Sequence, residues 1–361
     1  MRPCLTERLR TFEMKDHPRT CRTNDALVLV LRVRTLGKWS MTCVGDLYEI
    51  IWGDGTMFDP GTEYHPERDM TYANGNRPDI GTVTHTFTSP GYYKLYFFGR
   101  LLEFGFSQTW LRSYLGCMDL IACTSFGNHP LLNLRGFHGH PYLETVPREL
   151  PKTVQNLDHA FRDCSRFNCS NVRFWDVSNV QSLVQTFRNA KAFNQDIGRW
   201  DVSNVTTLEG TFMGAHVFDQ DLDQWDTSSV ERMDFTFSGA SRFNGNIRTW
   251  NTSKVRDMNY MFTDTERFNG CIGDWDTSSV RNMHAMFFHA KSFDQEIGRW
   301  NTKCVVNMNG MFSNASSFNR DIRQWNTKSL VTAGYMFHGA SRFRYDLSCW
   351  TAPRMVVPWH T

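Results

Sequence analysis

A tryptophan returns every 25 residues through the latter part of the 361-residue chain. This tryptophan column consists of Trp175, Trp200, Trp225, Trp250, Trp275, Trp300, Trp325 and Trp350. Twelve residues after the first seven tryptophans lies a first phenylalanine column, made of Phe187, Phe212, Phe237, Phe262, Phe287, Phe312 and Phe337. Six residues further on lies a second one, made of Phe193, Phe218, Phe243, Phe268, Phe293, Phe318 and Phe343. A period of about 20–50 residues is typical of solenoids, propellers and other arrays.

The positions around each tryptophan predict the structure of one unit. The tryptophan and the residue two places later repeat with the period of a strand. Apolar residues five, eight and twelve places after the tryptophan have the spacing of one helix face. Four units place a serine before that segment, where a helix N-cap is expected: Ser203, Ser228, Ser253 and Ser278. We therefore expect residues 157–350 to form a solenoid with one short parallel strand and one short helix per repeat.

The chain before the repeats has the pattern of a small β domain. Four apolar or aromatic runs are separated by turn sequences, and we expect strands at residues 26–33, 47–52, 82–87 and 92–98. Several short strands of this kind predict a β-sandwich over residues 1–108, behind a polar N-terminal lead. Residues 109–156 contain degenerate versions of the unit and are expected to cap the solenoid. Residues 351–361 are then a C-terminal tail.

The sequence WGDGT at residues 52–56, followed by HTF at 85–87 and GYYKL at 91–95, resembles the polycystic-kidney-disease (PKD) type of immunoglobulin-like domain. The resemblance implies a two-sheet sandwich for the first part of the chain. Asp54 and His85 lie in its motifs. A turn-locking hydrogen bond is the favoured role for them, and a binding site is the alternative, because Asp and Gly dominate turns for backbone reasons.

The repeat itself, as in MFSNASSFNRDI at residues 311–322, resembles the BspA-like leucine-rich-repeat surface proteins. Together the two resemblances imply a mixed β/α fold, in which a PKD-like sandwich precedes a leucine-rich-repeat-like solenoid. Members of the BspA-like family are usually exported, are adhesive or of unknown role, and bring no catalytic residues. Related repeats also occur in proteins of large DNA viruses.

Two columns beside the tryptophans are candidates for a partner-binding face, because solenoids offer extended surfaces. The pre-tryptophan column is Arg199, Gln224, Thr249, Asp274, Arg299 and Gln324. The post-tryptophan column is Asp201, Asp226, Asn251, Asp276 and Asn301. The mixture of Asn and Asp in the second column indicates side-chain bonding to the backbone, with partner binding as the second interpretation.

Other sites are weakly indicated. Residues 219–226 hold several aspartates, but they lack the glycine and the distal glutamate of an EF-hand calcium loop. His138 and His140 are the one tight histidine pair, with no third ligand at a standard metal spacing. No phosphate loop or known catalytic motif occurs, so we expect no catalytic residues, no cofactor, no metal and no enzyme activity.

Charge and hydropathy restrict the partners and the location. The formal net charge is +2, without a basic cluster for nucleic acid. The N-terminal 20 residues are charged throughout and contain no apolar signal segment. The longest apolar run, residues 26–31, is far shorter than the roughly 20 residues of a membrane helix. Ten scattered cysteines indicate reduced thiols in a protein made inside a cell.

These observations predict a non-enzymatic protein that binds other proteins or serves as a structural scaffold, within a virus particle or another large multi-subunit assembly. The alternative is a cell-surface adhesin or receptor-type binding protein, which the missing export signal disfavours. A structural component would show fixed stoichiometry, whereas an adhesin would bind a separate ligand from an exposed surface.

Overall fold

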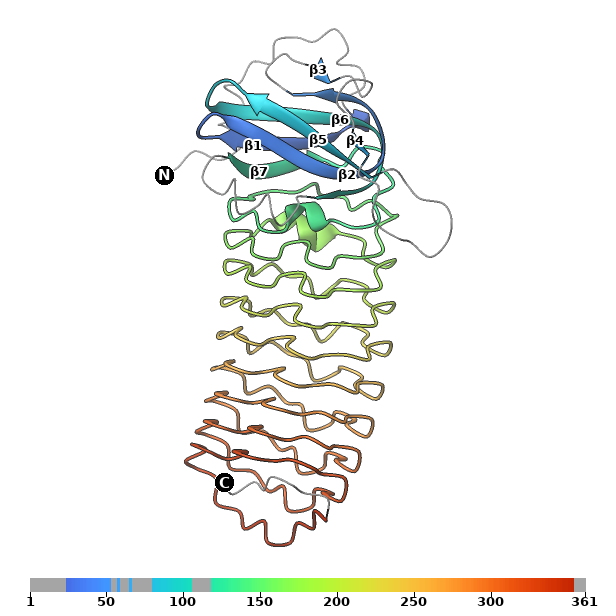
Figure 1. Cartoon of the computed structure of the whole chain (residues 1–361). Coiled ribbons are helices and arrows are strands. Elements are labelled where there is room, and N and C mark those ends of the chain that lie inside the picture. The colour runs from blue at the N-terminus through green and yellow to red at the C-terminus, as the bar shows by residue number, and fades with distance from the viewer. Residues whose placement is uncertain (1–23, 53–56, 59–64, 67–79, 106–117, 354–361) are drawn as a thin grey trace. The chain divides into compact units, whose positions relative to one another are not determined.

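The computed structural model describes residues 24–52, 57–58, 65–66, 80–105 and 118–353 (Figure 1). The chain divides into two compact units, Met1–Pro130 and Leu131–Thr361. Residues 109–156, where degenerate capping repeats were expected, are divided between them. Their strand Met118–Ser125 belongs to the sheet of the first unit, and residues from 131 onward begin the coils of the second.

The first unit contains one antiparallel sheet of seven strands, in the order β4-β5-β2-β6-β1-β7, with β3 paired to β2. The strands are β1 (Leu27–Val33), β2 (Gly37–Ile51), β3 (Met57–Phe58), β4 (His65–Pro66), β5 (Ile80–Phe87), β6 (Gly91–Gly105) and β7 (Met118–Ser125). The four expected strands fall on β1, β2, β5 and β6. The expected two-sheet immunoglobulin-like sandwich is not confirmed, because the described strands are joined in a single sheet.

The long strand β2 bends so that its two ends meet. The rings of Trp39 and Trp52 lie 5.6 Å apart, whereas thirteen residues of straight strand span about 43 Å. The bend lies at a register shift next to Gly45, whose φ is +128°. A Cβ atom there would lie 2.1 Å from the carbonyl oxygen of Arg100 on β6, so only glycine fits. His85 stacks on Trp52 at 4.5 Å, and Asp54 lies outside the described residues.

His129 is buried in this unit and bonds to the backbone of two strands. Nδ1 of the imidazole accepts the amide of Leu101 at 3.1 Å, and Nε2 lies 3.0 Å from both the carbonyl of Phe97 and the amide of Leu27. A neutral imidazole carries one proton, so Nε2–H donates to the Phe97 carbonyl while Nδ1 accepts from Leu101. Protonation of Nδ1 would break the bond to Leu101, so the fold favours the neutral ring. Burial accordingly lowers the pKa of His129 below its ordinary value.

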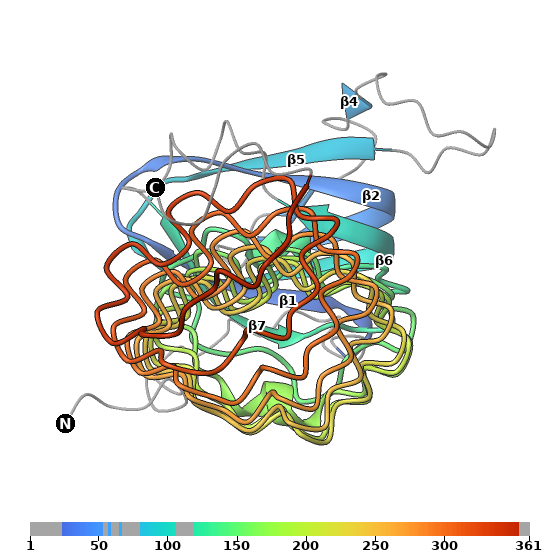
Figure 2. The same cartoon turned by 90° about the horizontal axis from the view of Figure 1, so that it is seen from below.

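The second unit is a stack of coils, which we call the array (residues 131–353), and its core consists of columns of like side chains. Successive rings of the first phenylalanine column lie 5.5–5.7 Å apart, and those of the second 5.8–6.0 Å. The measured tryptophan pairs lie at 6.1–6.3 Å. Figure 2 shows the coils nearly superposed when viewed end-on. One coil alone would leave both faces of each ring in water.

Neighbouring coils are joined by backbone hydrogen bonds from alternate residues. The amides of Gln185, Phe187 and Asn189 donate to carbonyls of the next coil at 2.7–2.8 Å. From residue 157 onward, two residues of each coil have a positive φ: His159 and Asp163, Gln185 and Asn189, Gly210 and Gly214, Phe235 and Gly239, Tyr260 and Asp264, Ala285 and His289, Gly310 and Asn314, Tyr335 and Gly339. These left-handed residues turn their amides away from the local chain and toward the next coil.

The expected mixed β/α solenoid with a helix in every repeat is wrong. The described array contains two short 3₁₀ helices, Arg135–Phe137 and Ser170–Phe174, and no α-helix. The left-handed residues interrupt the chain every few positions, so the apolar spacing of three and four arises from consecutive turns. The parallel pairing is one isolated bridge per coil, at Asn133, Asn156, Ser182, Thr207, Arg232, Asp257, Asn282, Asn307 and Thr332. It lies seven residues after the tryptophan and not beside it.

Indole N–H groups add bonds between coils. Each tryptophan from Trp200 to Trp350 donates from Nε1 to the carbonyl three residues before the previous tryptophan, at 2.9–3.2 Å. Trp175 makes the equivalent bond to Pro147 at 2.9 Å. The cost of burying these N–H groups away from water is therefore offset by a hydrogen bond. No helix among the described residues is long and apolar enough to cross a membrane.

The last coil has an unpaired edge. The amides of Met308, Gly310, Phe312 and Asn314 all donate to the coil that follows them. Their counterparts 25 residues later, in residues 333, 335, 337 and 339, donate to no residue that the structure describes. The aromatic columns end here too, and Phe337 and Phe343 are partly exposed where their predecessors are buried.

Replacing Phe262 with alanine should lower the free energy of unfolding of the array by about 3–5 kcal/mol. The ring is fully buried and lies within 5.7 Å of Phe237 and 5.5 Å of Phe287. Urea denaturation measures the loss, and Phe174→Ala, at a position 50% exposed, is the matched control with a small effect. Equal losses in the two variants would contradict the stacked core.

Acid should destabilise the first unit through His129. The unfolded chain binds a proton near pH 6.5, whereas the pKa of His129 in the folded unit is lower. The free energy of unfolding should therefore fall by up to about 1.4 kcal/mol per pH unit below that point. Urea denaturation between pH 8 and pH 5 measures the slope, and His129→Gln should remove this component. An identical slope in both proteins would refute the assignment.

Candidate partner-binding site

The pre-tryptophan column lies on the surface of the array. Arg199, Gln224, Thr249, Asp274, Arg299 and Gln324 are all exposed. Asp274 pairs with Arg248 at 3.0 Å, and both side chains are more than 60% exposed (67% and 63%). Such pairs contribute only about 0–1 kcal/mol, so they leave the side chains free to exchange partners. The Thr249 hydroxyl donates to the carbonyl of Asp223. The column thus presents a changing set of polar groups to solvent.

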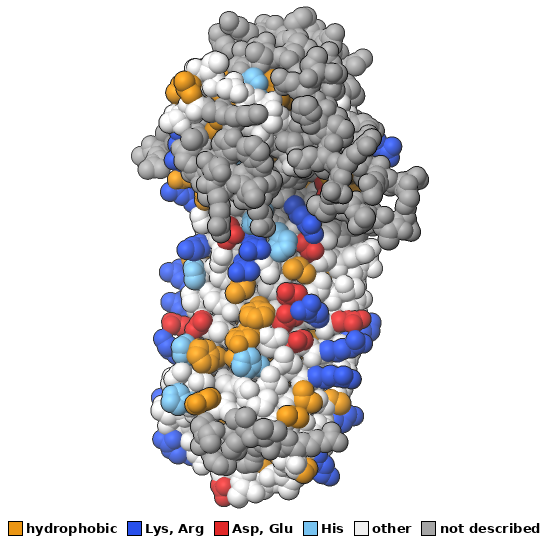
Figure 3. Space-filling view, in the orientation of Figure 1, with side chains coloured by type: hydrophobic (Ala, Val, Ile, Leu, Met, Phe, Trp, Pro, Cys, Tyr) orange, Lys and Arg blue, Asp and Glu red, His pale blue; other side chains and the backbone are white. Residues whose placement is uncertain are grey.

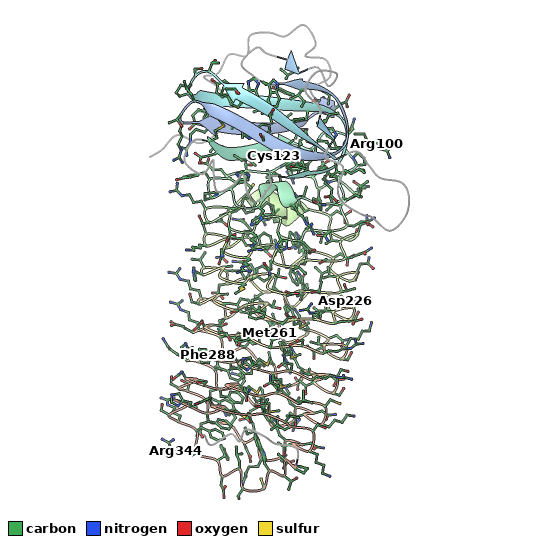
Figure 4. The ribbon with its side chains drawn as sticks, viewed as in Figure 1. Arg100, Cys123, Asp226, Met261, Phe288 and Arg344 are labelled. Carbon is green, nitrogen blue, oxygen red and sulfur yellow. The ribbon has the colours of Figure 1, made fainter. Side chains whose placement is uncertain are left out.

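The post-tryptophan column forms turns. Asp201, Asp226, Asn251, Asp276 and Asn301 are exposed, and their Oδ1 atoms accept the amide two residues later at 2.9–3.3 Å. Figure 4 shows Asp226 at the edge of the stack. Because Asn and Asp both carry this oxygen, either residue closes the turn, and the expected bonding of side chain to backbone is confirmed.

The electrostatics of the column agree with this role. The backbone N–H of Ser228 holds the pKa of Asp226 below its ordinary value, and that of Ser278 does the same for Asp276. The expected helix N-caps at Ser203, Ser228, Ser253 and Ser278 are wrong. No helix follows them, and their amides are donors to the preceding Asn or Asp.

Sequence analysis missed a ladder of Asn and Asp side chains that runs along the array. Its members directly follow the second phenylalanine column: Asn168, Asn194, Asp219, Asn244, Asn269, Asp294 and Asn319. The Oδ1 of each accepts the backbone amide of the corresponding residue one coil later, at 2.8–3.1 Å. The last amide belongs to Arg344, which has no acceptor of its own, so the ladder ends there. The recurring Asn or Asp after phenylalanine was the available signal.

The residues weighed for metal binding have other roles. Asp219 and Asp221 each accept a backbone amide at 2.8 Å, from Asn244 and Asn246. His138 lies 3.4 Å from Asp163 and lowers the pKa of that carboxyl to about 2. Burial lowers the pKa of His140 to about 3. Across the described parts of the chain, no three His, Cys, Asp or Glu residues are grouped to hold a metal ion.

The repeated coil has a counterpart among known families. The model of the family described as "Mycoplasma protein of unknown function, DUF285" matches residues 155–274 and 264–356, more than half of the chain. The chain belongs to this family. DUF285 repeats are of the BspA-like kind, so the match supports that part of the resemblance.

The family match begins in the array and leaves the first unit outside it. The PKD-like resemblance of residues 52–95 therefore gains no support from DUF285. No curated protein and no solved structure matches the chain. The family description assigns no function.

Replacing Asp226 should separate its turn bond from its charge. Asp226→Asn keeps Oδ1 and should leave stability nearly unchanged, whereas Asp226→Ala removes the acceptor and should cost about 0.5–1.5 kcal/mol. Urea denaturation of the two variants provides the comparison. A loss of stability in the Asn variant as large as in the Ala variant would show that charge, and not the turn bond, matters at this position.

Proposed function

We propose that this protein is a non-catalytic scaffold that binds other proteins along the surface of its array, as a structural part of a virus particle or another large assembly. The observation that supports this most is a contrast between inner and outer columns. Inward positions keep the same aromatic residue from coil to coil, whereas the exposed pre-tryptophan column changes at nearly every step. A core of identical side chains beneath a surface of varied side chains suits the binding of partner proteins.

Two further features support a scaffold. The array has no inserted loops, so it presents its outward side chains at a regular spacing set by the coils. Bonds between coils come from the backbone, from indole groups and from Asn and Asp side chains, all of which hold the coils in register. A surface held in this way loses little conformational entropy when a partner binds.

Purification of the native complex, followed by identification of the accompanying proteins, tests this function. A scaffold in an assembly should copurify with partners at fixed stoichiometry. The double charge reversal Arg199→Glu and Arg299→Glu should weaken at least one of these interactions. Arg242→Glu with Arg267→Glu reverses two charges that are also exposed but lie outside the column, and is the matched control.

Retention of every partner by the Arg199 and Arg299 double variant would contradict the assignment of the pre-tryptophan column. Binding to a separate ligand from a cell surface, without fixed stoichiometry, would instead support the adhesin alternative.

A further inference from the structure

One outward position of each coil holds residues that its backbone conformation disfavours. The position ten residues after the tryptophan is left-handed in every coil, and two coils fill it with glycine, Gly210 and Gly310. Phe235 and Tyr260 occupy it with φ of 58° and 55°. A left-handed conformation costs a residue other than glycine roughly 1–2 kcal/mol. Large aromatic residues at such a position, facing outward and only partly buried, suggest a function beyond folding.

The two rings form an ordered pair. Phe235 stacks on Tyr260 with ring centroids 4.7 Å apart and planes inclined by 11°. His284 holds the tyrosine, because Nδ1 of the imidazole bonds to the carbonyl of Asn309 at 2.9 Å and Nε2 lies 2.5 Å from the phenol oxygen. A carbonyl only accepts, so Nδ1 carries the proton and Nε2 accepts the tyrosine O–H. The ring pair is therefore fixed before any partner arrives.

Negative charge lies beside the rings. Asp234 directly precedes Phe235 but is buried, and the half-exposed Arg232 bonds to it at 2.9 Å and to Glu209 at 3.1 Å. Asp257 adds a third carboxylate, which acts on both Glu209 and Asp234. Burial and the nearby Asp234 raise the pKa of Glu209, as expected where carboxylates outnumber the cation between them. Figure 3 shows acidic and hydrophobic side chains side by side on the middle coils.

We propose that this surface, made of Glu209, Phe235, Asp257 and Tyr260, binds a basic, extended segment of a partner protein. We call it the acidic-aromatic face. The proposal rests on the proposed scaffold function and names a surface other than the pre-tryptophan column. A lysine or arginine is attracted both to aromatic ring faces and to the surplus carboxylates.

The spacing of the coils favours an extended partner. Parallel bridges join neighbouring coils, so the coils lie about 4.8 Å apart, and Asp257 lies about 10 Å along the array from Glu209, two coils away. A strand places every second side chain about 6.6 Å further along its axis. Two arginines at alternate positions of a strand are therefore closer together than the two carboxylates, and their long side chains extend far enough to contact both. Basic residues at alternate positions then meet Glu209, the ring pair and Asp257 in turn.

Peptide binding tests the proposal. The probe is a fluorescein-labelled ten-residue peptide of alternating arginine and threonine, measured by fluorescence anisotropy with the full-length protein. We expect saturable binding that weakens with salt. A peptide of the same composition with its arginines in one block should bind more weakly. A peptide of alternating glutamate and threonine should not bind. Equal binding of the arginine and glutamate peptides would overturn the proposal.

Glycine substitutions separate binding from folding. Phe235→Gly and Tyr260→Gly place at each left-handed position the residue that suits it best, so both variants should stay folded by circular dichroism. Each should bind the alternating arginine peptide about tenfold more weakly. Tyr335→Gly is the matched control, because Tyr335 is left-handed at the same position, 65% exposed and three coils beyond Tyr260. Its affinity should equal that of the wild type.

A folded Tyr260→Gly protein with wild-type affinity would overturn this surface. The scaffold function would survive that result, because its own test is the recovery of native partners and their response to Arg199 and Arg299. Loss of native partners from the Phe235 and Tyr260 variants, with peptide binding lost in parallel, would support both.

Discussion

Contact between identical aromatic side chains in successive coils is the interaction on which the array depends. Phe262 is covered by the rings of Phe237 and Phe287, and each of these is covered in turn by the next. No coil has a core of its own, so stability is close to a sum of neighbour terms. This requirement keeps the inward columns constant. It leaves the outward positions free to vary, so these positions can be adapted to bind a partner.

The period and the buried columns of the array could be predicted because the constant spacing of Trp and Phe in the sequence gives both. The conformation of the coil could not. Apolar residues three and four apart occur on a helix face and also in consecutive turns, and the choice depends on two left-handed residues per coil. Gly210 and Gly310 hint at that conformation, but Tyr260 and Ala285 occupy it as well, and non-glycine residues rarely do.

The first unit shows a similar division. Its strands follow from local alternation and from turn residues, and four of them were predicted. Their assembly into a single sheet depends on the fold-back of β2 at Gly45, which brings Trp39 against Trp52. The fold-back requires the backbone of β6 to lie close against Gly45, and the residues around Gly45 give no sign of this in the sequence. The sequence motif shared with PKD-like domains predicts strands and turns, but it does not specify this pairing order.

For the candidate sites, the turn role of the post-tryptophan column was predictable, because Asn and Asp share only the oxygen that closes the turn. The acidic-aromatic face was missed for the opposite reason. Its central position holds Gln185, Gly210, Phe235, Tyr260 and Ala285 in successive coils, so no column stands out. Only the structure shows that Phe235 and Tyr260 are stacked, strained and beside carboxylates.

The amides of residues 333, 335, 337 and 339, which bond to no described residue, have a consequence for how such a protein changes length. They match the donors that every earlier coil offers to its successor, so a duplicated 25-residue unit inserted ahead of the last coil would find compatible partners on both sides. The length of the array can thus change in steps of one whole coil. Gain or loss of a coil would alter the reach of its surface by one fixed increment while leaving every existing joint intact.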